Sequence, residues 1–360
     1  MSGRYAVIMA GGKGERFWPL STSKHPKQLL ALVGDKPLIA QAVDRLEGLV
    51  PPENVFVVTN AELVDATREA APLLPPKNIV GEPIGRDTAA AVACGGALVK
   101  AKDENGVFAV LTADQVMGDL DAFSATLKAG MDLAEQNDIL VTIGIEPTFP
   151  STGFGYIESG DTFATESGVE FRKAVRFVEK PDEATATQYL ETGKFYWNSG
   201  MFIWSVQSLE KAFGAHCPEM LELMDALTGY AKDGKIVAGM DATYPNLGKI
   251  SVDYALMEKA GNIVMACGTF AWDDVGSWPA LESHFDQDET GNTKIGQVET
   301  LNADGNIVYS RDRLTAVIGV KDLVVVQAEG VTLVCPKDRA QDIKQMVVAL
   351  REKGGYDGLL

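Results

Sequence analysis

Apolar runs alternate with helix-like stretches through the first half of this 360-residue chain, and no other feature restricts its possible folds as much. A strand buried on both faces is apolar throughout, so the alternation predicts an α/β fold with a mostly parallel sheet covered by helices. Expected strands cover residues 5–10, 55–59, 78–81, 107–112 and 139–145, with expected helices at residues 38–49, 61–71, 88–101 and 122–135. Ligands of such sheets bind beyond the carboxyl ends of the strands, so the residues that follow each strand are site candidates.

The texture of the sequence changes twice after this region. Residues 149–204 are β-rich and punctuated by glycines, as in an insertion that forms the opposite wall of a cleft. Helical patterns return at residues 206–230 and 252–259. Further short strands are expected at residues 295–298, 307–309, 315–318, 323–327 and 332–334, followed by a final helix at residues 339–351. A chain of this length suits two domains, which we expect at residues 1–290 and 291–360, the second being a small β domain.

The first expected strand ends in a glycine-rich bend followed by basic residues, in the segment YAVIMAGGKGERFWPLSTSKHPKQ at residues 5–28. The glycines are Gly11, Gly12 and Gly14, and the cations are Lys13, Arg16, Lys24 and Lys27. Backbone N–H groups of a bend without side chains can point together at one anion, which the cations then surround. Residues 1–34 hold five Lys or Arg and one acid, on a chain whose net charge is −18. This concentration of positive charge favours a polyphosphate site over a plain strand-to-helix turn.

Several classes of site and function do not fit the sequence. The Walker pattern is missing, and Phe17 stands where the dinucleotide fingerprint needs its third glycine. A net charge of −18 argues against nucleic acid or an anionic membrane as the main partner, and no apolar run approaches the ~20 residues that cross a bilayer. Four scattered cysteines indicate neither a zinc site nor a disulfide framework. Since the N-terminus has no signal-peptide pattern, we expect a cytoplasmic protein.

Aspartates follow strand-like runs at two distant places. Asp114 follows such a run in LTADQ, and Asp273 and Asp274 follow another in FAWDDVGSW. Carboxylates from both places could meet around one Mg²⁺, which would bridge phosphate oxygens during group transfer. The residues alone do not choose between Asp273 and Asp274, and a turn or helix-cap role is the alternative for Asp114. The three histidines lie in no GxSxG or HExxH context, which favours direct displacement at phosphorus over a covalent intermediate.

Three further segments place polar side chains beside expected strands or helices. In FVEKP, Glu179 and Lys180 end a strand, where a lysine suits a phosphate and a glutamate suits sugar hydroxyls. In WNSGMFIW, Asn198 directly precedes an apolar strand, as a ligand clamp or as a bulge. In EPIGRDTAAA, Arg86 precedes a helix that starts at Thr88, and a helix N-terminus can bind a base edge or an anion. An exposed turn and an ordinary helix cap are the alternatives for the first and last of these segments.

Together these motifs resemble the nucleotidyltransferase family of sugar-1-phosphate pyrophosphorylases. AGGKGERFWPLS with PKQ is similar to the family's signature loop, and EPIGRDTAAA, LTADQ, FVEKP, WNSGMF and DVGSW follow in the family's order. Phe17, Trp18 and the EP…R-x-T-A segment point to the guanylyl branch. The resemblance implies a GT-A-like, Rossmann-like domain with a left-handed β-helix-like tail. It also implies Mg²⁺-dependent attack of mannose 1-phosphate on the α-phosphorus of GTP.

The resemblance implies a role for each candidate residue of this chain. The triphosphate would be held by Gly11, Gly12, Gly14 and Arg16. The α-phosphate would be neutralised by Lys27, and the metal would be held by Asp114 and by Asp274, which aligns with the Asp of the family's DVG. Guanine would be contacted by Arg86 and Thr88. Mannose would be contacted by Gly155, Glu179 and Asn198, and its phosphate by Lys180.

Two departures from the family's pattern bear on these expectations. Asp87 stands where the family often has Asn, which affects the expected base contacts. The chain also stops at residue 360 without a cupin-like second half, so we expect a monofunctional enzyme. The implied partners are GTP, mannose 1-phosphate and a second copy in a homodimer. The alternatives are a guanylyltransferase for another sugar phosphate, of the heptose or fucose type, and a sensor that binds a sugar nucleotide without turnover.

Overall fold

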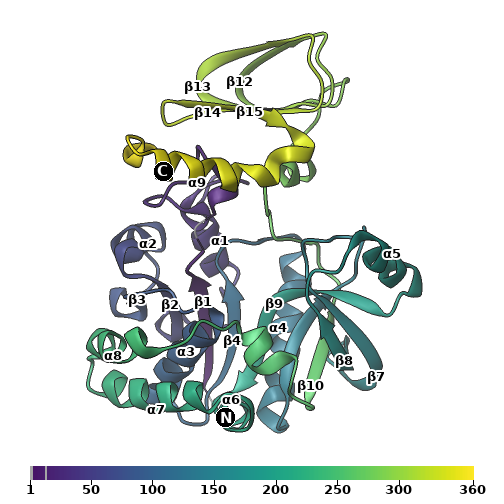
Figure 1. Ribbon diagram of the computed structural model, residues 1–360. Coiled ribbons are helices and arrows are strands. Elements are labelled where there is room, and N and C mark those ends of the chain that lie inside the picture. The colour runs from purple at the N-terminus through teal and green to yellow at the C-terminus, as the bar shows by residue number, and fades with distance from the viewer. Residues whose placement is uncertain (1–2, 13) are drawn as a thin grey trace. The chain divides into compact units, whose positions relative to one another are not determined.

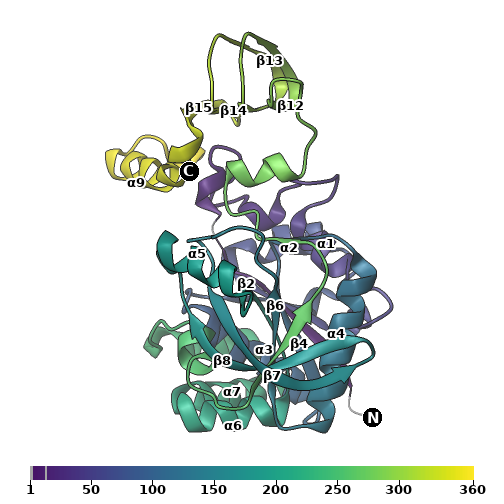
Figure 2. The ribbon, with the colours of Figure 1, turned by 90° about the vertical axis from the view of Figure 1, so that its right-hand side faces the viewer.

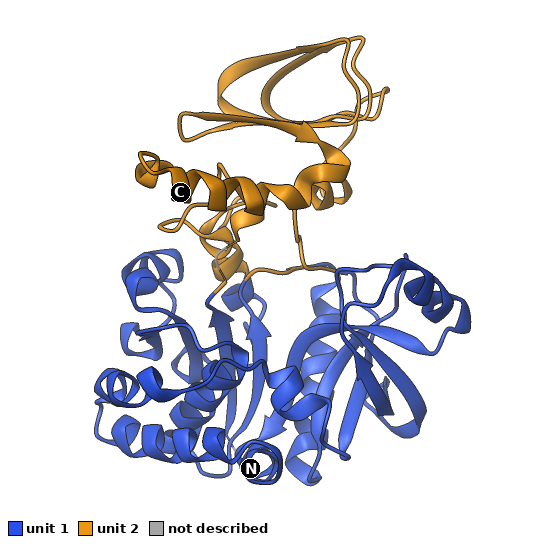
Figure 3. Ribbon diagram, in the orientation of Figure 1, with its two compact units in different colours: residues 1–11, 42–113, 117–272 blue, residues 12–41, 114–116, 273–360 orange. Residues whose placement is uncertain are grey.

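The computed structural model describes residues 3–12 and 14–360 (Figure 1). The chain divides into two compact units, which Figure 3 draws in different colours. Unit 1 comprises Met1–Gly11, Ala42–Ala113 and Met117–Trp272, and unit 2 comprises Gly12–Gln41, Asp114–Val116 and Asp273–Leu360. The expected domains at residues 1–290 and 291–360 divide the chain differently and stay a prediction. Lys13, one of the expected loop cations, lies outside the described residues.

Four neighbouring strands of the unit 1 sheet are parallel, as expected. They are β1 (Arg4–Ala10), β2 (Val55–Asn60), β3 (Ile79–Glu82) and β4 (Val107–Thr112), in the order β3-β2-β1-β4. Their side chains are buried almost throughout. Burial on both faces is the reason that these strands are continuous apolar runs in the sequence.

The rest of this nine-stranded sheet is mixed. β9 (Phe195–Ser205) lies between β4 and β6 (Leu140–Ile145) and runs antiparallel to both. β10 (Ile263–Gly268) is parallel to β6, and β8 (Val169–Val178) and β7 (Tyr156–Glu166) continue the sheet with antiparallel pairs. The α/β class is confirmed, with the parallel ladders grouped at β1–β4 and at β6 with β10. Antiparallel neighbours need no helical crossover, so the glycine-punctuated insertion could add strands directly to the sheet.

Helices cover both faces of the unit 1 sheet (Figures 1 and 2). Phe202 and Trp204 of β9 belong to the buried cluster that contains α3, whereas Ile203 lies against Gly130 of α4. Since successive side chains of a strand point to opposite faces, α3 and α4 lie on opposite sides of the sheet. The helices of the unit and its borders are α1 (Leu38–Asp44), α2 (Val64–Ala70), α3 (Thr88–Lys102), α4 (Leu120–Gln136), α5 (Glu183–Thr192), α6 (Val206–His216), α7 (Pro218–Lys232) and α8 (Ile236–Thr243).

Several expected elements differ from the structure. The helical pattern at residues 206–230 is two helices, because Pro218 starts α7 and cannot continue α6. The expected helix at residues 252–259 is a short π-helix, Asp253–Met257. Asn198, expected directly before a strand, lies inside β9, which begins at Phe195 and shifts its register against β6 close to this residue. The two-residue strands β5 (Val116–Met117) and β11 (Trp272–Asp273), which pair with each other, were not expected.

The C-terminal strands of unit 2 form a coiled sheet of β-helix type. β12 (Thr293–Leu301), β13 (Ile307–Ile318) and β14 (Leu323–Ala328) are successive parallel neighbours, and β15 (Val331–Pro336) closes the sheet in the antiparallel sense. Asparagines stack between the coils, where Asn306 Nδ2 donates a hydrogen bond of 2.9 Å to Asn292 Oδ1. The two short strands expected at residues 307–309 and 315–318 are parts of β13.

One hydrophobic core joins the N-terminal loop of unit 2 to its coiled sheet. Phe17 and Trp18 of the loop share this core with Trp278, with Tyr309 of β13, and with Val347 of α9 (Ile343–Lys353). The rings of Phe17 and Trp278 lie 5.3 Å apart between centroids. The loop is therefore held by residues that follow it by more than two hundred positions. Across the described part of the chain, no helix has the length and apolar character needed to span a membrane.

Candidate active site

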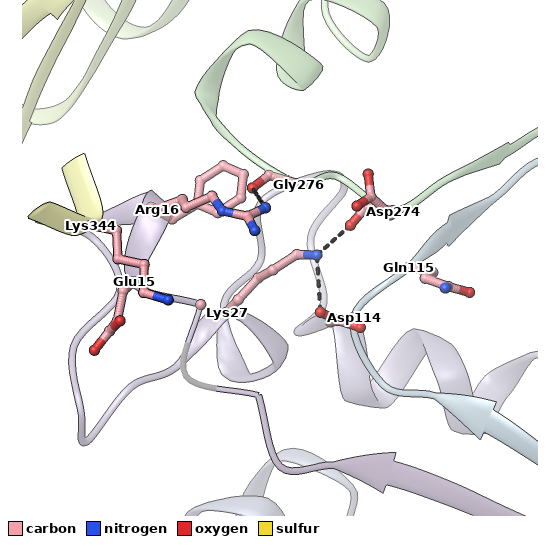
Figure 4. Close-up of a pocket in the computed structure, with 10 residues that line it drawn as sticks. Glu15, Arg16, Lys27, Asp114, Gln115, Asp274, Gly276 and Lys344 are labelled. Carbon is pink, nitrogen blue, oxygen red and sulfur yellow. Dashed lines mark hydrogen bonds and ion pairs between the residues drawn. The ribbon is translucent and has the colours of Figure 1, made fainter. Parts of the chain in front are cut away.

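A pocket in unit 2 collects most of the expected triphosphate and metal residues, although Gly11 and Gly12 are not among those that line it (Figure 4). Its volume is about 470 Å³. The residues that line it are Gly14, Glu15, Arg16, Phe17, Lys27, Asp114, Gln115, Asp274, Gly276 and Lys344. Five residues that the sequence predicts as site residues thus lie around one cavity: Gly14, Arg16, Lys27, Asp114 and Asp274. Gln115 and Lys344 were not selected.

Lys27 is the buried centre of this pocket. The residue is only 5% exposed, and its Nζ donates a hydrogen bond of 3.1 Å to Oδ2 of Asp114 and a second one to the main-chain oxygen of Asp274. Gly14 is required for this arrangement, because a Cβ built on it would lie 2.4 Å from the Cβ of Lys27. Gly14 also has a φ of 60°, which L side chains rarely adopt.

Arg16 reaches the pocket from a short 3-10 helix, Glu15–Phe17. The buried Phe17 anchors this turn in the core. Arg16 Nη1 donates a hydrogen bond of 3.1 Å to the main-chain oxygen of Gly276. Its other N–H groups make no hydrogen bond with a described residue, so they can contact a ligand. The neighbouring Glu15 forms an ion pair with Arg351 of α9.

The structure separates the roles of the two adjacent aspartates. The carboxylate of Asp273 contacts other residues of the protein. Its Oδ1 accepts a hydrogen bond of 2.7 Å from the Val275 N–H, and its Oδ2 lies 2.9 Å from Nε2 of His284. Asp274 lines the pocket. Val275, which follows it, is fully buried at a φ of 44°. A β-branched residue is strained in this region, so the packing around Val275 enforces a turn that sets the direction of Asp274.

The electrostatics of Asp274 suit a site for a divalent cation. Burial raises the pKa of its carboxyl to about 6, Lys27 and Arg16 lower it, and the charges of Asp273 and Asp114 raise it further. Two carboxylates that disfavour each other's ionisation are stabilised by a hard cation between them. Asp114 and Asp274 with substrate phosphates therefore fit Mg²⁺. The described part of the chain contains no cluster of three or more His, Cys, Asp or Glu side chains that could hold a metal ion by itself.

Glu82, a buried acid of unit 1 that the sequence analysis did not select, lies beside Gly11. It is the last residue of β3 and is 6% exposed, and its buried Oε1 makes no hydrogen bond with any described residue. A Cβ on Gly11 would lie 3.8 Å from its Oε2. Burial raises the pKa of Glu82 to about 7, and the nearby Tyr244 hydroxyl lowers it only in part. Its place at a strand's carboxyl end was the signal that could have identified it.

The two residues expected to contact guanine already have partners within unit 1. Arg86 donates hydrogen bonds of 2.8 and 2.7 Å to the main-chain oxygens of Tyr244 and Pro245. The Thr88 hydroxyl accepts a hydrogen bond of 2.8 Å from the Val252 N–H. Asp87, whose φ is 68°, caps the N-terminus of α3 with its side chain. These bonds shape the loop at the N-terminus of α3, and the contacts of Arg86 and Thr88 with a base stay predictions.

The residues expected to contact the sugar lie together in unit 1. The Asn198 N–H donates a hydrogen bond of 2.8 Å to the main-chain oxygen of Gly155, and a Cβ on Gly155 would lie 2.7 Å from Oε2 of Glu179. Lys180 forms an ion pair with Glu179, and its backbone has a φ of 44°. Asn198 Nδ2 donates a hydrogen bond of 2.9 Å to Oδ1 of Asp253, which was not selected from the sequence. Burial raises the pKa of Asp253 above its usual range, and the hydrogen bond from Asn198 lowers it.

Comparisons with known proteins identify the family of this chain. The model of the nucleotidyl transferase family matches residues 5–291, and that of the mannose-phosphate isomerase/GMP-like β-helix domain matches residues 296–350. A mannose-1-phosphate guanylyltransferase of Escherichia coli K12 is 34% identical over 98% of this chain and 74% of its own length. The alginate biosynthesis protein AlgA of Pseudomonas putida is 34% identical over 97% of this chain and 72% of its own.

A solved structure is similar over the same extent. The crystal structure of a Thermus thermophilus protein described as a mannose-1-phosphate geranyltransferase superposes with a TM-score of 0.85 and is 34% identical. The superposition covers 97% of this chain and 99% of that one. The chain thus belongs to the nucleotidyl transferase family, among relatives of the mannose-1-phosphate guanylyltransferase type.

Proposed function

We propose that this protein transfers GMP from GTP to α-D-mannose 1-phosphate and releases pyrophosphate. The observation that carries the proposal is the unit 2 pocket in which Lys27 joins Asp114 to Asp274 beside Arg16. The mannose-1-phosphate guanylyltransferases that are similar over nearly the whole chain support the choice of nucleotide and sugar. A cytoplasmic location and a homodimer stay predictions.

The reaction is an in-line displacement at the α-phosphorus of GTP. A phosphate oxygen of mannose 1-phosphate forms a bond to this phosphorus while the bond to the bridging oxygen of the departing pyrophosphate breaks. Negative charge then has to be stabilised on the α-phosphate oxygens and on the leaving group. We assign Lys27 to the α-phosphate, and Arg16 with the backbone of Gly11, Gly12 and Gly14 to the triphosphate. A preplaced donor of this kind contributes a factor on the order of 10² to 10³ in rate.

Asp114 and Asp274 are the residues that would hold Mg²⁺, which when bound supplies a divalent charge to the phosphate oxygens. Lys27 holds the Asp114 carboxylate in place and contacts the backbone at Asp274, so one cation positions both metal ligands. The Asp274 carboxyl has to lose its proton for this role. Because its pKa is about 6, it does so at neutral pH.

We assign the sugar to the cluster around Gly155 in unit 1. Lys180 is the contact for the phosphate of mannose 1-phosphate, and Glu179 and Asn198 are the contacts for its hydroxyls. A carboxylate and an amide suit these groups because hydroxyls both donate and accept hydrogen bonds. Asp253 fixes the direction of the Asn198 amide.

For the base, we add Glu82 to Arg86 and Thr88. The edge of guanine presents N–H donors at N1 and N2, and an ionised carboxylate can accept from both. Oε1 of Glu82 is a buried acceptor that has no partner among the residues that the structure describes, which costs free energy until a donor reaches it. Adenine has no donor in the N2 position, so this acceptor favours guanine.

The test is a pyrophosphate-release assay of four nucleoside triphosphates against mannose, heptose, fucose and glucose 1-phosphates, with and without Mg²⁺. We expect release only when GTP, mannose 1-phosphate and Mg²⁺ are present together. Faster release with UTP or dTTP than with GTP would overturn the nucleotide assignment. Preference for another sugar phosphate would overturn the sugar assignment, and release from no combination would overturn the enzymatic function itself.

A further inference from the structure

Lys344, a lysine of the C-terminal helix, lines the unit 2 pocket described above. It lies in the first turn of α9, at the end of the chain opposite to the signature loop, yet it lines the same cavity as Gly14, Arg16 and Lys27. Figure 4 draws its side chain beside that of Glu15. The side chain is exposed and makes no ion pair with any described residue. The metal and sugar assignments above give it no role.

Contacts within unit 2 hold α9 and the segment after it against the signature loop. Nη2 of Arg351, a residue of α9, lies 3.4 Å from Oε1 of Glu15. The indole N–H of Trp18 donates a hydrogen bond of 2.7 Å to the main-chain oxygen of Leu359, and the Ser23 hydroxyl donates one of the same length to Leu360. The position of Lys344 relative to Glu15 and Arg16 is therefore fixed by several independent contacts rather than by the lysine itself.

The charges in the pocket leave Lys344 available for an anion. Lys27 is paired with Asp114, and the nearby carboxylate of Glu15 is paired with Arg351. Lys344 is a point charge on a flexible stem, which suits a phosphate oxygen whose position changes when a bond breaks. A cation in the first turn of a helix is also unfavourable for the helix dipole, so helix stability does not explain its presence.

We propose that Lys344 contacts the terminal phosphates of the nucleotide, which depart as pyrophosphate, so that the C-terminal β-helix domain supplies part of the substrate site. This inference rests on the proposed function and extends it. Lys27 and the two pocket aspartates define the place of the α-phosphate and the metal. Lys344 lies beside Glu15 and lines the same pocket as Gly14, at the loop whose backbone we assign to the rest of the triphosphate.

The test uses the full chain with Lys344→Met, Lys344→Arg and the control Lys353→Met. The control removes the same charge from the same helix at an exposed residue that does not line the pocket. Binding of inorganic tripolyphosphate with Mg²⁺ is measured by calorimetry, together with KM values in both directions of the reaction. For Lys344→Met we expect about tenfold weaker tripolyphosphate binding, which corresponds to the loss of one charge-assisted contact. The KM for GTP and for pyrophosphate should rise by a similar factor, and the KM for mannose 1-phosphate should not change.

The outcomes separate this inference from the proposed function. An unchanged tripolyphosphate affinity in Lys344→Met, or an equal loss in Lys353→Met, would overturn the role of Lys344. A wild-type chain that binds no tripolyphosphate would also overturn the role of Lys344. Tripolyphosphate binding that depends on Lys344 in a chain that releases no pyrophosphate with any sugar phosphate would support the contact and overturn the proposed function. Recovery of affinity in Lys344→Arg would support a charge contact over a change in the packing of α9.

Discussion

Lys27 donates a 3.1 Å hydrogen bond to Asp114, and this pair is the point at which three separate segments of unit 2 meet. The same ammonium group contacts the main-chain oxygen of Asp274. A buried lysine is stable only when opposite charge compensates its desolvation, and Asp114 provides that charge. The pair thus links the lysine that we assign to the α-phosphate to the residues that we assign to the metal, so a change at either residue should affect the other.

Lys27→Met should reduce kcat by at least about 10²-fold, because it removes the cation that we assign to the α-phosphate. Methionine keeps most of the volume of the side chain in this buried position. Steady-state kinetics with GTP and mannose 1-phosphate measure the effect, and a thermal melt checks that the chain is folded. Lys24→Met is the matched control, since Lys24 is a loop cation that is exposed and does not line the pocket. Near-normal turnover in Lys27→Met would refute the assigned role.

Asp274→Asn should make the metal-free protein more stable at pH 8 while it abolishes Mg²⁺-dependent turnover. The folded-state pKa of Asp274 is about 6, above the unfolded value of 3.8, so the folded state binds the proton more tightly. Its contribution to the free energy of unfolding is therefore most favourable at low pH and is lost as the pH rises from about 4 to about 6. The gain from the amide at pH 8 is at most about 3 kcal/mol. Denaturant unfolding at pH 4 and pH 8, with EDTA, measures it.

The matched variant for this comparison is Asp273→Asn. Asp273 accepts a hydrogen bond from the Val275 N–H and faces His284, so its replacement should destabilise the turn at both pH values. Equal effects of the two variants on stability would contradict the different environments of the two aspartates.

Much of this site could be predicted from the sequence because a simple rule governs it. Parallel strands are apolar runs, and the residues that follow them lie at one edge, so the glycine loop and Asp114 can be identified without a structure. The role of Asp274 needs coordinates, since only the hydrogen bonds of Asp273 distinguish the two neighbours. Lys344 could not be found from local pattern, because its proximity to Arg16 depends on the packing of α9 on the loop.

The departures in the fold have similar causes. The antiparallel position of β9 depends on long-range pairing that periodicity does not encode, and this pairing places Asn198 inside a strand instead of before one. The π-helix at Asp253 has the sequence pattern of an ordinary helix, because one additional residue in a turn leaves the apolar spacing nearly unchanged. The pattern therefore does not single out Asp253, although this residue fixes the amide of Asn198.

Glu82→Gln should reduce the preference for GTP over ATP and remove a pH dependence of stability. An amide can accept one hydrogen bond from guanine where the carboxylate accepts two, so we expect kcat/KM for GTP to fall by about 10- to 10²-fold. The folded-state pKa of Glu82 is about 7, above its usual 4.5, so the wild-type chain loses stability as the pH rises from about 4.5 to about 7. Denaturant unfolding across this range should show a smaller decline in the variant. Unchanged selectivity together with the stability change would assign Glu82 to the fold alone.

Gly155→Ala should raise the KM for mannose 1-phosphate by about tenfold and leave the KM for GTP unchanged. The new Cβ would lie 2.7 Å from Oε2 of Glu179, so that carboxylate has to move away from its place beside Asn198. The displaced atom is the end of a flexible side chain, and Gly155 has no positive φ, so the free energy of unfolding should change by less than about 1 kcal/mol. Gly153→Ala is the matched control, because its Cβ would meet only Oγ of Ser151, at 3.7 Å. A rise in KM that is equal in both variants would show that the loop as a whole, and not the position of Glu179, governs the sugar contact.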